Sequence, residues 1–456
     1  MLDNISKNLR EQYKTKWSGY TLKSLLQRRF IKNVLTVASG TMAAQAITLI
    51  FSPIITRLYG PEIFGILGLF MSMIGIVGPI TSLTYPIAIV LPREDSEAKG
   101  LIRLSLYIAI ILSTIMSFIL ILFSAPIIKV FNAEMLAPYL LFIPIMMFLG
   151  ATLQVTEQWL IRKKYYKVTA KVSVTNSLFV NISKTAVGFF HPVATSLIFI
   201  TTIGNALNSI MLVWGARRSL NFSNKKKHMD RRKTKRSLFN LAKKYYDFPV
   251  YRAPEMFFNA ISQGLPIIML TTFFGPASAG FYAIGKRVME LPSQLVGRSV
   301  GDVFYPRITE VANEGGSISG FLTKATLVMA AVGLIPFGII VSFGPFLFGL
   351  VFGEEWIVAG EYARWIALWS YFVFINIPSV KTLPVISAQR FFLFFSIIST
   401  VVRIATLAVG GYMFNSDIIA VALYAISGGV LNIILIVITI LKSKNFILRR
   451  AIKLND

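Results

Sequence analysis

Long apolar runs separated by short polar connections make up most of this chain. Each of the twelve runs that we distinguish is long enough, at about 20 residues, for an α-helix to cross the hydrocarbon of a bilayer. They are too long and continuous for barrel strands, so helices are expected. The expected spans are 34–56, 63–91, 104–125, 139–160, 169–190, 195–215, 254–274, 281–305, 321–343, 361–382, 391–412 and 418–441. The pattern therefore predicts an all-α polytopic membrane protein.

One polar segment, residues 215–253, interrupts the series after the sixth run. It holds thirteen Lys and Arg residues and two acids, Asp230 and Asp247. Such a segment is too polar to enter a bilayer. It divides the chain into a basic N-terminal segment, an N-lobe, a basic linker, a C-lobe and a basic tail. The expected boundaries are 1–33, 34–215, 216–253, 254–441 and 442–456.

Positive charges are concentrated in every second connection. The N-terminal segment, the connections after the second and fourth spans, the linker and the tail are all rich in Lys and Arg, whereas the alternate connections carry few, with Arg57 and Lys129 the clear cases. Cytoplasmic loops of membrane proteins carry the excess of Lys and Arg. Both termini and the linker are therefore expected in the cytoplasm.

The two halves share an ordered set of motifs. Gly60-Pro61-x-x-x-Gly65 follows the first span, and Gly275-Pro276-x-x-x-Gly280 follows the seventh. Tyr85-Pro86 and Tyr305-Pro306 end the second and eighth spans. An even number of spans separates the copies, so the halves run in the same direction. This predicts two six-helix lobes related by a parallel repeat about the membrane normal, with a central cavity.

Composition excludes several classes of protein. The chain is 55% hydrophobic and 14% charged, against about 25% charged in soluble domains. The Lys and Arg residues that give the net charge of +26 lie mostly between apolar runs, where they set the orientation of the spans. The sequence predicts no soluble basic domain that would bind nucleic acid. Cys is absent, and His191 and His228 are far apart, so no metal site is expected. No cleavable signal peptide is expected either.

Several stretches resemble bacterial polysaccharide flippases. The first half contributes SPIITRLYGPEIFGILGLF (52–70) and YPIAIVLPREDSEA (85–98). The second half contributes FFGPASAGFYAIGKRVMELPSQLVG (273–297), VFYPRITE (303–310) and VFGEEWIVAGEYAR (351–364). The similarity covers nearly the whole chain. This polysaccharide transporter family belongs to the MOP exporter superfamily, with the lipid II flippases and the multidrug-and-toxin extrusion (MATE) exporters.

The resemblance implies a bacterial inner-membrane protein that is a transporter rather than an enzyme. Its cargo would be an undecaprenyl-diphosphate-linked oligosaccharide, the repeat unit of an O-antigen, capsule or exopolysaccharide. It would pass from the cytoplasmic to the outer leaflet by alternating access between two lobes. Membrane lipids, a polysaccharide polymerase and chain-length proteins are the expected partners, and no cofactor is expected.

Charged side chains inside spans are costly, so they usually face a cavity or a partner. We expect a cationic, water-filled lumen, because Arg binds phosphate oxygens in pairs. The expected cations are Arg298, Arg403, Arg287, Lys286, Lys184 and Arg57. The expected polar lining is Gln45, Thr48, Ser52 and Gln294.

Helical spacing supports the polar faces of individual spans. Residues at steps of three and four share a helix face. In the eighth span this groups Arg287, Glu290, Gln294, Arg298 and Tyr305; in the first it groups Thr41, Gln45, Thr48, Ser52 and Thr56; in the fifth it groups Ser173, Ser177 and Lys184. Alternatively, Lys286–Glu290 and Arg298–Asp302 are structural pairs at i, i+4, and Arg57 anchors the end of the first span.

Four acids in the spans are candidates for proton or sodium coupling, because burial raises the pKa of a carboxylate. They are Glu157, Glu290, Asp302 and Glu255. Two other functions remain open. A MATE-like antiporter of small organic molecules would favour a carboxylate deep in the first lobe, where spans 1, 2, 3, 5 and 6 have none. A membrane glycosyltransferase or polymerase would need a sizeable catalytic loop, and the acid pair Glu354-Glu355 has no accompanying base.

Overall fold

The computed structural model describes residues 28–130, 134–224, 238–293, 298–314 and 316–455. These residues form helices and no strand, which confirms the all-α prediction. The first half and the linker contain α3 (Arg28–Val77), η2 (Gly78–Ile80), α4 (Tyr85–Ala88), α5 (Asp95–Val130), η3 (Glu134–Tyr139), α6 (Phe142–Lys163), α7 (Tyr166–Phe190), α8 (Ala194–Asn224) and α9 (Leu238–Lys244).

The second half begins with a single π-helical turn, η4 (Phe248–Arg252), which leads directly into α10. Its helices are α10 (Ala253–Phe274), α11 (Pro276–Pro292), α12 (Arg298–Asn313), α13 (Ile318–Phe352), η6 (Glu354–Trp356), α14 (Ile357–Ile375), α15 (Ile377–Thr382), α16 (Gln389–Phe414) and α17 (Asp417–Asn455).

Seven of the described helices are long and apolar enough to cross a membrane, and they account for eight of the twelve expected spans, because α3 contains the first two. Helices α6, α7, α11 with α12, and α14 with α15 stand at the other four. The chain is therefore a multi-pass membrane protein. Its exterior agrees, since large apolar side chains such as Leu122 (72% exposed) and Phe190 (82% exposed) face outward in numbers that water would not tolerate.

Three expected spans differ from the helices observed. The second ends near Ile80, because Leu83 and Thr84 adopt positive φ angles that interrupt the helix before α4. In the eighth, α11 extends to Pro292 and α12 begins at Arg298, and residues 294–297 between them lie outside the described residues. The tenth is divided at Asn376, shortly before Pro378. Proline lacks an amide hydrogen and crowds the preceding turn, which explains the division of the tenth.

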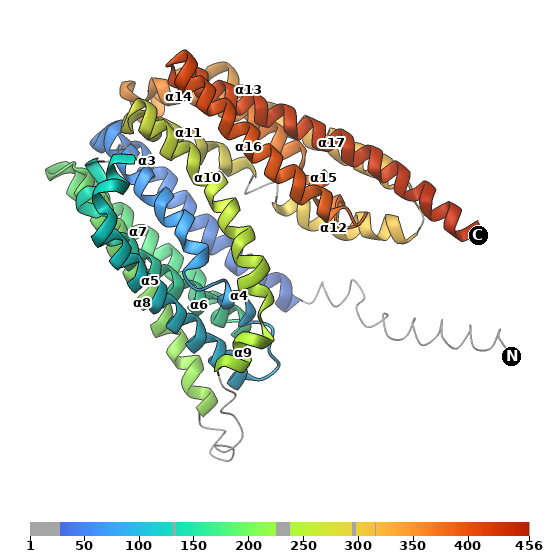
Figure 1. Ribbon diagram of the computed structural model, residues 1–456, viewed down its shortest axis with the longest axis horizontal. Helices are drawn as coiled ribbons and strands as arrows, with labels where there is room; N and C mark the ends of the chain where they lie inside the picture. Colours follow the sequence, from blue (N-terminus) through green and yellow to red (C-terminus); the bar gives the residue numbers. More distant parts are fainter. Residues whose placement is uncertain (1–27, 131–133, 225–237, 294–297, 315, 456) are drawn as a thin grey trace.

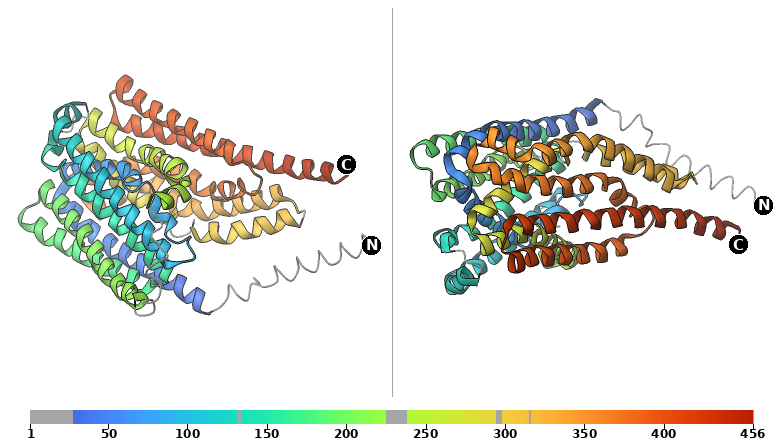
Figure 2. Two further views of the ribbon diagram at one scale, coloured as in Figure 1. Left: turned by 60° about the horizontal axis from the view of Figure 1, so that its bottom comes forward. Right: turned by 90° about the horizontal axis from the view of Figure 1, so that it is seen from above.

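The helices form two groups that meet at one end and diverge toward the other. In Figure 1 the groups are closest at the upper left, near the α10–α11 turn and the bend of α3, and they separate toward the ends of the described chain. The left view of Figure 2 shows the same divergence after a turn of the molecule. Helix α3 of the first half packs against α10 and α11 of the second half. The molecule therefore has the shape of a V.

The two Gly-Pro motifs meet each other where the lobes touch. Gly60 bends α3 with a φ of 68°, and Gly275 separates α10 from α11 with a φ of 87°, a region that favours glycine. A Cβ on Gly65 would lie 1.6 Å from the carbonyl oxygen of Pro276, and one on Gly280 would lie 2.1 Å from that of Pro61. The contact is thus reciprocal, as a two-fold relation between the halves requires.

Polar contacts reinforce the same end of the V. The Arg57 guanidinium donates to the carbonyl oxygens of Leu350 (2.8 Å) and Val351 (3.3 Å). The indole of the fully buried Trp356 donates to the carbonyl oxygen of Thr56 at 3.2 Å. Helix α3 is thereby tied to the end of α13 and to η6. We call the region that contains these hydrogen bonds and the Gly-Pro contact the closed end.

The linker docks on the N-lobe. Leu241 of α9 is buried against Gly100 of α5. Glu97 pairs with Lys244 and accepts a hydrogen bond from the Tyr245 hydroxyl at 3.1 Å. The hydrogen bond to Glu97 raises the pKa of the Lys244 ammonium. The linker thus contributes to an N-lobe core as well as providing charge.

Candidate functional site

A polar cavity of about 520 Å³ lies between the lobes. Helices α3, α7 and α8 of the N-lobe supply most of its wall, and α11 of the C-lobe supplies the rest. Its polar and charged lining consists of Thr41, Gln45, Thr48, Ser52, Ser173, Asn176, Ser177, Asn181, Lys184, Thr201, Asn205, Asn208, Arg287 and Glu290. A volume of this size falls within the range of ligand pockets, about 300–1,000 Å³.

The faces expected from helical spacing on α3 and α7 lie in this wall. On α3 they comprise Thr41, Gln45, Thr48 and Ser52, and on α7 they comprise Ser173, Ser177 and Lys184. Thr56 departs from the α3 face, because its side chain is fully buried and donates back to the carbonyl oxygen of Ser52 at 2.9 Å. Ser and Thr commonly return a bond to the preceding turn.

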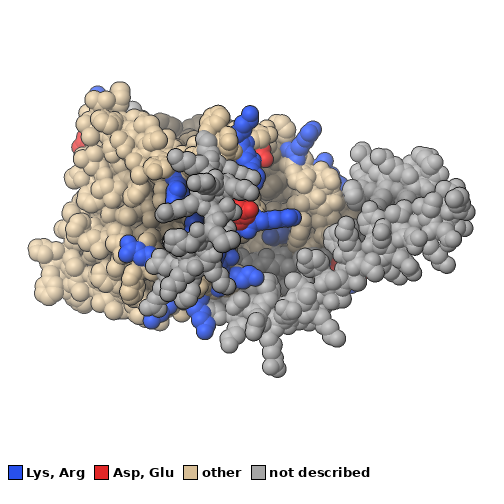
Figure 3. Space-filling model, turned by 90° about the horizontal axis from the view of Figure 1, so that it is seen from below, with Lys and Arg blue, Asp and Glu red and all other residues tan. Residues whose placement is uncertain are grey.

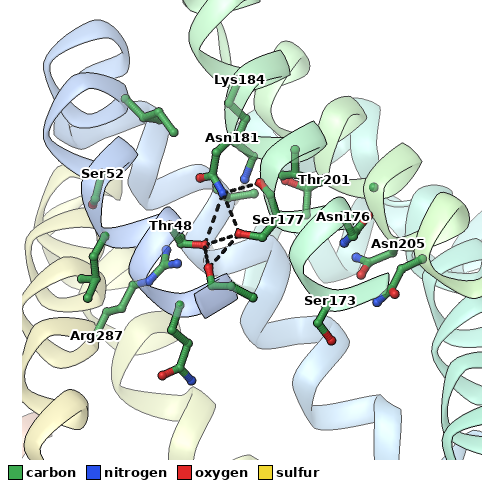
Figure 4. Close-up of a pocket in the computed structure, with 18 of the residues that line it drawn as sticks. Thr48, Ser52, Ser173, Asn176, Ser177, Asn181, Lys184, Thr201, Asn205 and Arg287 are labelled. Carbon is green, nitrogen blue, oxygen red and sulfur yellow. Dashed lines mark hydrogen bonds between the residues drawn. The ribbon is translucent and has the colours of Figure 1, made fainter. Parts of the chain in front are cut away.

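A small hydrogen-bond network joins α3 to α7 across this wall (Figure 4). The Thr48 and Ser177 hydroxyl oxygens are 3.0 Å apart, and the Ser177 hydroxyl also donates to the carbonyl oxygen of Ala44 at 2.8 Å. The Asn181 amide donates to the carbonyl oxygen of Ser177 at 2.7 Å and to the Thr48 hydroxyl at 3.2 Å. These groups are satisfied within the protein, so they hold the wall together.

Two cations face the cavity from opposite lobes. Lys184 comes from α7 and is half-buried, whereas Arg287 comes from α11 and is exposed. Arg287 repels Lys184 electrostatically. Glu290, three residues after Arg287 on α11, attracts Arg287. Neither cation forms an ion pair or side-chain hydrogen bond with a described residue. Glu290 lies 3.9 Å from Lys286 instead.

Lys286 and Arg403 belong to the interior of the C-lobe. The Lys286 ammonium donates to the Gln263 side-chain oxygen at 3.0 Å. The Arg403 guanidinium lies 4.8 Å from the ring centres of both Trp369 and Tyr424. Arg403 lines a second cavity, of about 200 Å³, between α15, α16 and α17. The structure therefore does not bring Arg403 into the cavity that holds Arg287.

The remaining expected residues are scattered. Arg57 lies at the closed end, Glu255 pairs with Arg252 at 2.6 Å beside the linker, and Glu157 is half-buried on α6 away from the cavity lining. Gln294 lies outside the described residues, and so do the side chains of Arg298 and Asp302.

Part of the polar wall was not anticipated from the sequence. Asn176 and Asn181 on α7, and Thr201, Asn205 and Asn208 on α8, line the cavity. The signal was present for α8, because positions 201, 205 and 208 are separated by four and three residues and so share a helix face. Neutral amides cost less in a span than charges do, so their presence in a span is a weaker indication of a cavity.

Basic side chains gather on one face of the molecule. Figure 3 shows Lys and Arg side chains gathered near the middle of the face that it draws, whereas few charged side chains are visible at the left of the view, toward the closed end. On α6, Arg162 and Lys163 both pair with Asp95. The uneven distribution of Lys and Arg along the sequence therefore corresponds to an uneven distribution over this face of the molecule.

Comparisons with known proteins match this architecture. A family described as "Polysaccharide biosynthesis protein" matches residues 54–361. An inward-facing multidrug-resistance MATE family transporter of the MOP superfamily is 12% identical with a TM-score of 0.66, over 89% of this chain and 98% of that one. The lipid II flippase MurJ, in an inward closed conformation, is 14% identical with a TM-score of 0.63, over 92% of each chain. No curated protein sequence matches this chain.

Proposed function

The chain belongs to the polysaccharide biosynthesis protein family, and on that premise we propose that it moves an undecaprenyl-diphosphate-linked oligosaccharide across the bacterial inner membrane. The oligosaccharide would be the repeat unit of an O-antigen, capsule or exopolysaccharide. The MOP-type fold fits this cargo, because two lobes enclose a polar space inside an apolar bundle. Such a space lets the polar head cross while the polyprenyl tail stays in the lipid.

The observation that carries the proposal is the pair of unpaired cations, Lys184 and Arg287, at one cavity. Lys184 is half-buried, and an unpaired charge that is partly removed from water is unfavourable. The two charges also repel each other. A diphosphate would pair with both and remove the repulsion. Since one cation comes from each lobe, the bound anion would also favour a particular spacing of the lobes, which couples binding to movement.

The V shape supports an inward-facing conformation of the proposed transporter. The lobes meet at the closed end and diverge toward the ends of the described chain. With both termini in the cytoplasm, as the positive charges indicate, the cavity opens inward. Rocking the lobes about the cavity would then expose the head group to the outer leaflet. Glu290, the carboxylate that lines the cavity, is our candidate for proton or sodium coupling.

The test replaces each cavity cation in cells that depend on this gene for surface glycan. We expect Arg287→Ala and Lys184→Ala to reduce surface glycan at least tenfold at unchanged membrane levels, because each removes a charge-assisted bond worth about 1.5–3 kcal/mol. Arg287→Lys should retain more export than Arg287→Ala. Arg390→Ala, at an exposed position of α16, is the matched control. Normal export in both Ala variants would refute the proposal.

A MATE-like antiporter of small organic cations is the second candidate, and Glu290 in the cavity is the observation in its favour. The two cations in the same wall oppose it, since they would repel a cationic substrate. Loss of resistance to organic cations in the Glu290→Gln variant, with surface glycan unchanged, would support the antiporter. The reverse result would support the flippase.

A further inference from the structure

We infer that Asn176 of α7, with Asn205 and Asn208 of α8, forms the subsite that recognises the sugars of the cargo. This inference rests on the proposed function and assigns roles within the same cavity. Lys184 and Arg287 hold the diphosphate in this arrangement, and the three amides, which we call the amide wall, hold the glycan. The assignment follows from which polar groups are already satisfied and from what the others can bind.

The polar groups of the cavity are of two kinds. Thr48, Ser177 and Asn181 bond to one another and to main-chain carbonyl groups, so their hydrogen-bonding capacity is used within the protein. The amide wall is different. The Asn176 Oδ1 atom is buried and accepts no hydrogen bond from any described residue. A buried unpaired amide oxygen destabilises a fold, and because the Asn176 side chain lines the cavity, a rotation of that side chain would let the oxygen meet a ligand.

The two amides of α8 are also available. The Asn205 amide group donates only to the Met146 sulfur, at 3.7 Å, and a thioether is a weak acceptor. Asn208 forms no hydrogen bond with a described residue. Positions 205 and 208 are one helical turn apart and share a face. Together with Asn176 they present several donors and acceptors to the same space.

The chemistry of the amide wall distinguishes sugar from diphosphate. An ionised diphosphate offers acceptor oxygens only, so it cannot satisfy the Oδ1 acceptor of Asn176. Sugar hydroxyl groups and N-acetyl groups offer donors as well as acceptors, which is what an amide side chain pairs with. The free acceptor on Asn176 therefore selects the glycan rather than the anion as its partner.

The two subsites are separated in space. Lys184 follows Asn176 by eight residues on α7, which is about 12 Å along a helix axis. In Figure 4, Asn176 and Asn205 lie together on the side of the cavity away from Arg287, while Lys184 lies beyond Asn181. This spacing leaves room for a diphosphate at the cationic side and for sugar residues along the amide wall.

The experiment measures binding of two probes to the purified full-length chain. One probe is undecaprenyl diphosphate, and the other is the lipid-linked oligosaccharide extracted from cells that lack this protein. We expect Asn176→Leu and Asn208→Ala each to weaken binding of the oligosaccharide probe roughly fivefold and to leave the undecaprenyl diphosphate probe unchanged. Arg287→Ala should weaken both. Asn240→Ala, at an exposed position of α9, should change neither.

Thermal stability provides the second measurement. Leu has the same branching and number of side-chain heavy atoms as Asn and removes the unpaired oxygen, so Asn176→Leu should melt at the same temperature as the native chain or higher. A lower melting temperature would indicate a structural role and overturn the inference. Equal loss of both probes in the Asn variants, or no loss of either, would also overturn it. Full binding of both probes by Arg287→Ala would instead refute the diphosphate site, so the two failures are distinguishable.

Discussion

Arg403 and Lys184 are both cations within apolar helices, but their surroundings give them different roles. Arg403 is held between the rings of Trp369 and Tyr424, and its Nη2 atom donates to the Ser262 hydroxyl at 3.3 Å. Lys184 faces the cavity and has no partner among the described side chains. A cation enclosed by aromatic rings stabilises the fold, whereas an unpaired cation at a cavity is available to a ligand.

At the residue scale, we expect Arg403→Ala to lower the stability of the protein by about 1–2 kcal/mol for the lost cation–π contacts. Arg403→Lys should recover only part of the loss, because a guanidinium stacks on rings better than an ammonium does. The measurement is thermal unfolding in detergent, with Lys184→Met as the comparison. An Arg403→Ala protein of native melting temperature that fails in export would show that Arg403 contacts the cargo after all.

At the element scale, the two Gly-Pro motifs form the contact on which the lobes rest. Gly60 and Gly275 adopt positive φ angles that let each motif turn, and Gly65 and Gly280 allow the main chains to touch. In each copy, the first glycine thus allows the turn, and the second glycine, five residues later, allows the close contact between main chains. Because each glycine faces the proline carbonyl oxygen of the other copy, neither motif makes this contact alone.

We expect Gly65→Ala and Gly280→Ala to open the closed end, since the added Cβ would overlap a carbonyl oxygen at 1.6 and 2.1 Å. The chain contains no cysteine, so a single Cys at Ile55, which is 5% exposed, reports this opening through its rate of reaction with a membrane-impermeant maleimide added outside. Labelling should accelerate in both variants.

Gly75→Ala is the matched control, because a Cβ at Gly75 meets no atom within 4 Å. Its labelling rate should equal that of the unsubstituted reporter. Acceleration in the control as well would mean that any glycine loss in α3 loosens the lobe, and that the reciprocal contact has no special part in closure.

At the scale of the whole molecule, the closed end and the diverging lobes define one state of an alternating cycle. The closed end depends on a few polar bonds, chiefly Arg57 to Leu350 and Val351 and Trp356 to Thr56, in addition to apolar packing. Because the cavity lies beside this contact and takes one cation from each lobe, a change at either place alters the balance between states.

We expect Arg57→Ala to shift the population toward a form open at the closed end, as it removes the bonds to the end of α13. Spin labels on Cys residues placed at Lys164 and Arg390, both exposed, would report the distance between the diverging ends by double electron–electron resonance. The distance distribution should gain a shorter component in Arg57→Ala. An unchanged distribution would show that the Arg57 bonds have no part in holding the lobes together.

The sequence by itself determined the class of this protein. Apolar runs, the one-sided distribution of Lys and Arg, and the repeated Gly-Pro motifs each depend on local composition and spacing, so they can be read without a structure. The polar faces of α3 and α7 were predictable for the same reason, because helical periodicity alone groups Gln45 with Thr48 and Ser177 with Lys184.

Only the tertiary structure decided which of the polar residues meet. Lys184 and Arg287 lie on different lobes, and Arg403 is enclosed by two rings that are distant in sequence. Helical spacing cannot show such pairings, since it relates residues of one helix only. Periodicity also assumes a continuous helix, which fails at Asn376, and it gives no measure of which buried amides keep an unpaired atom. Those facts depend on how helices pack together, and that packing is what forms the cavity.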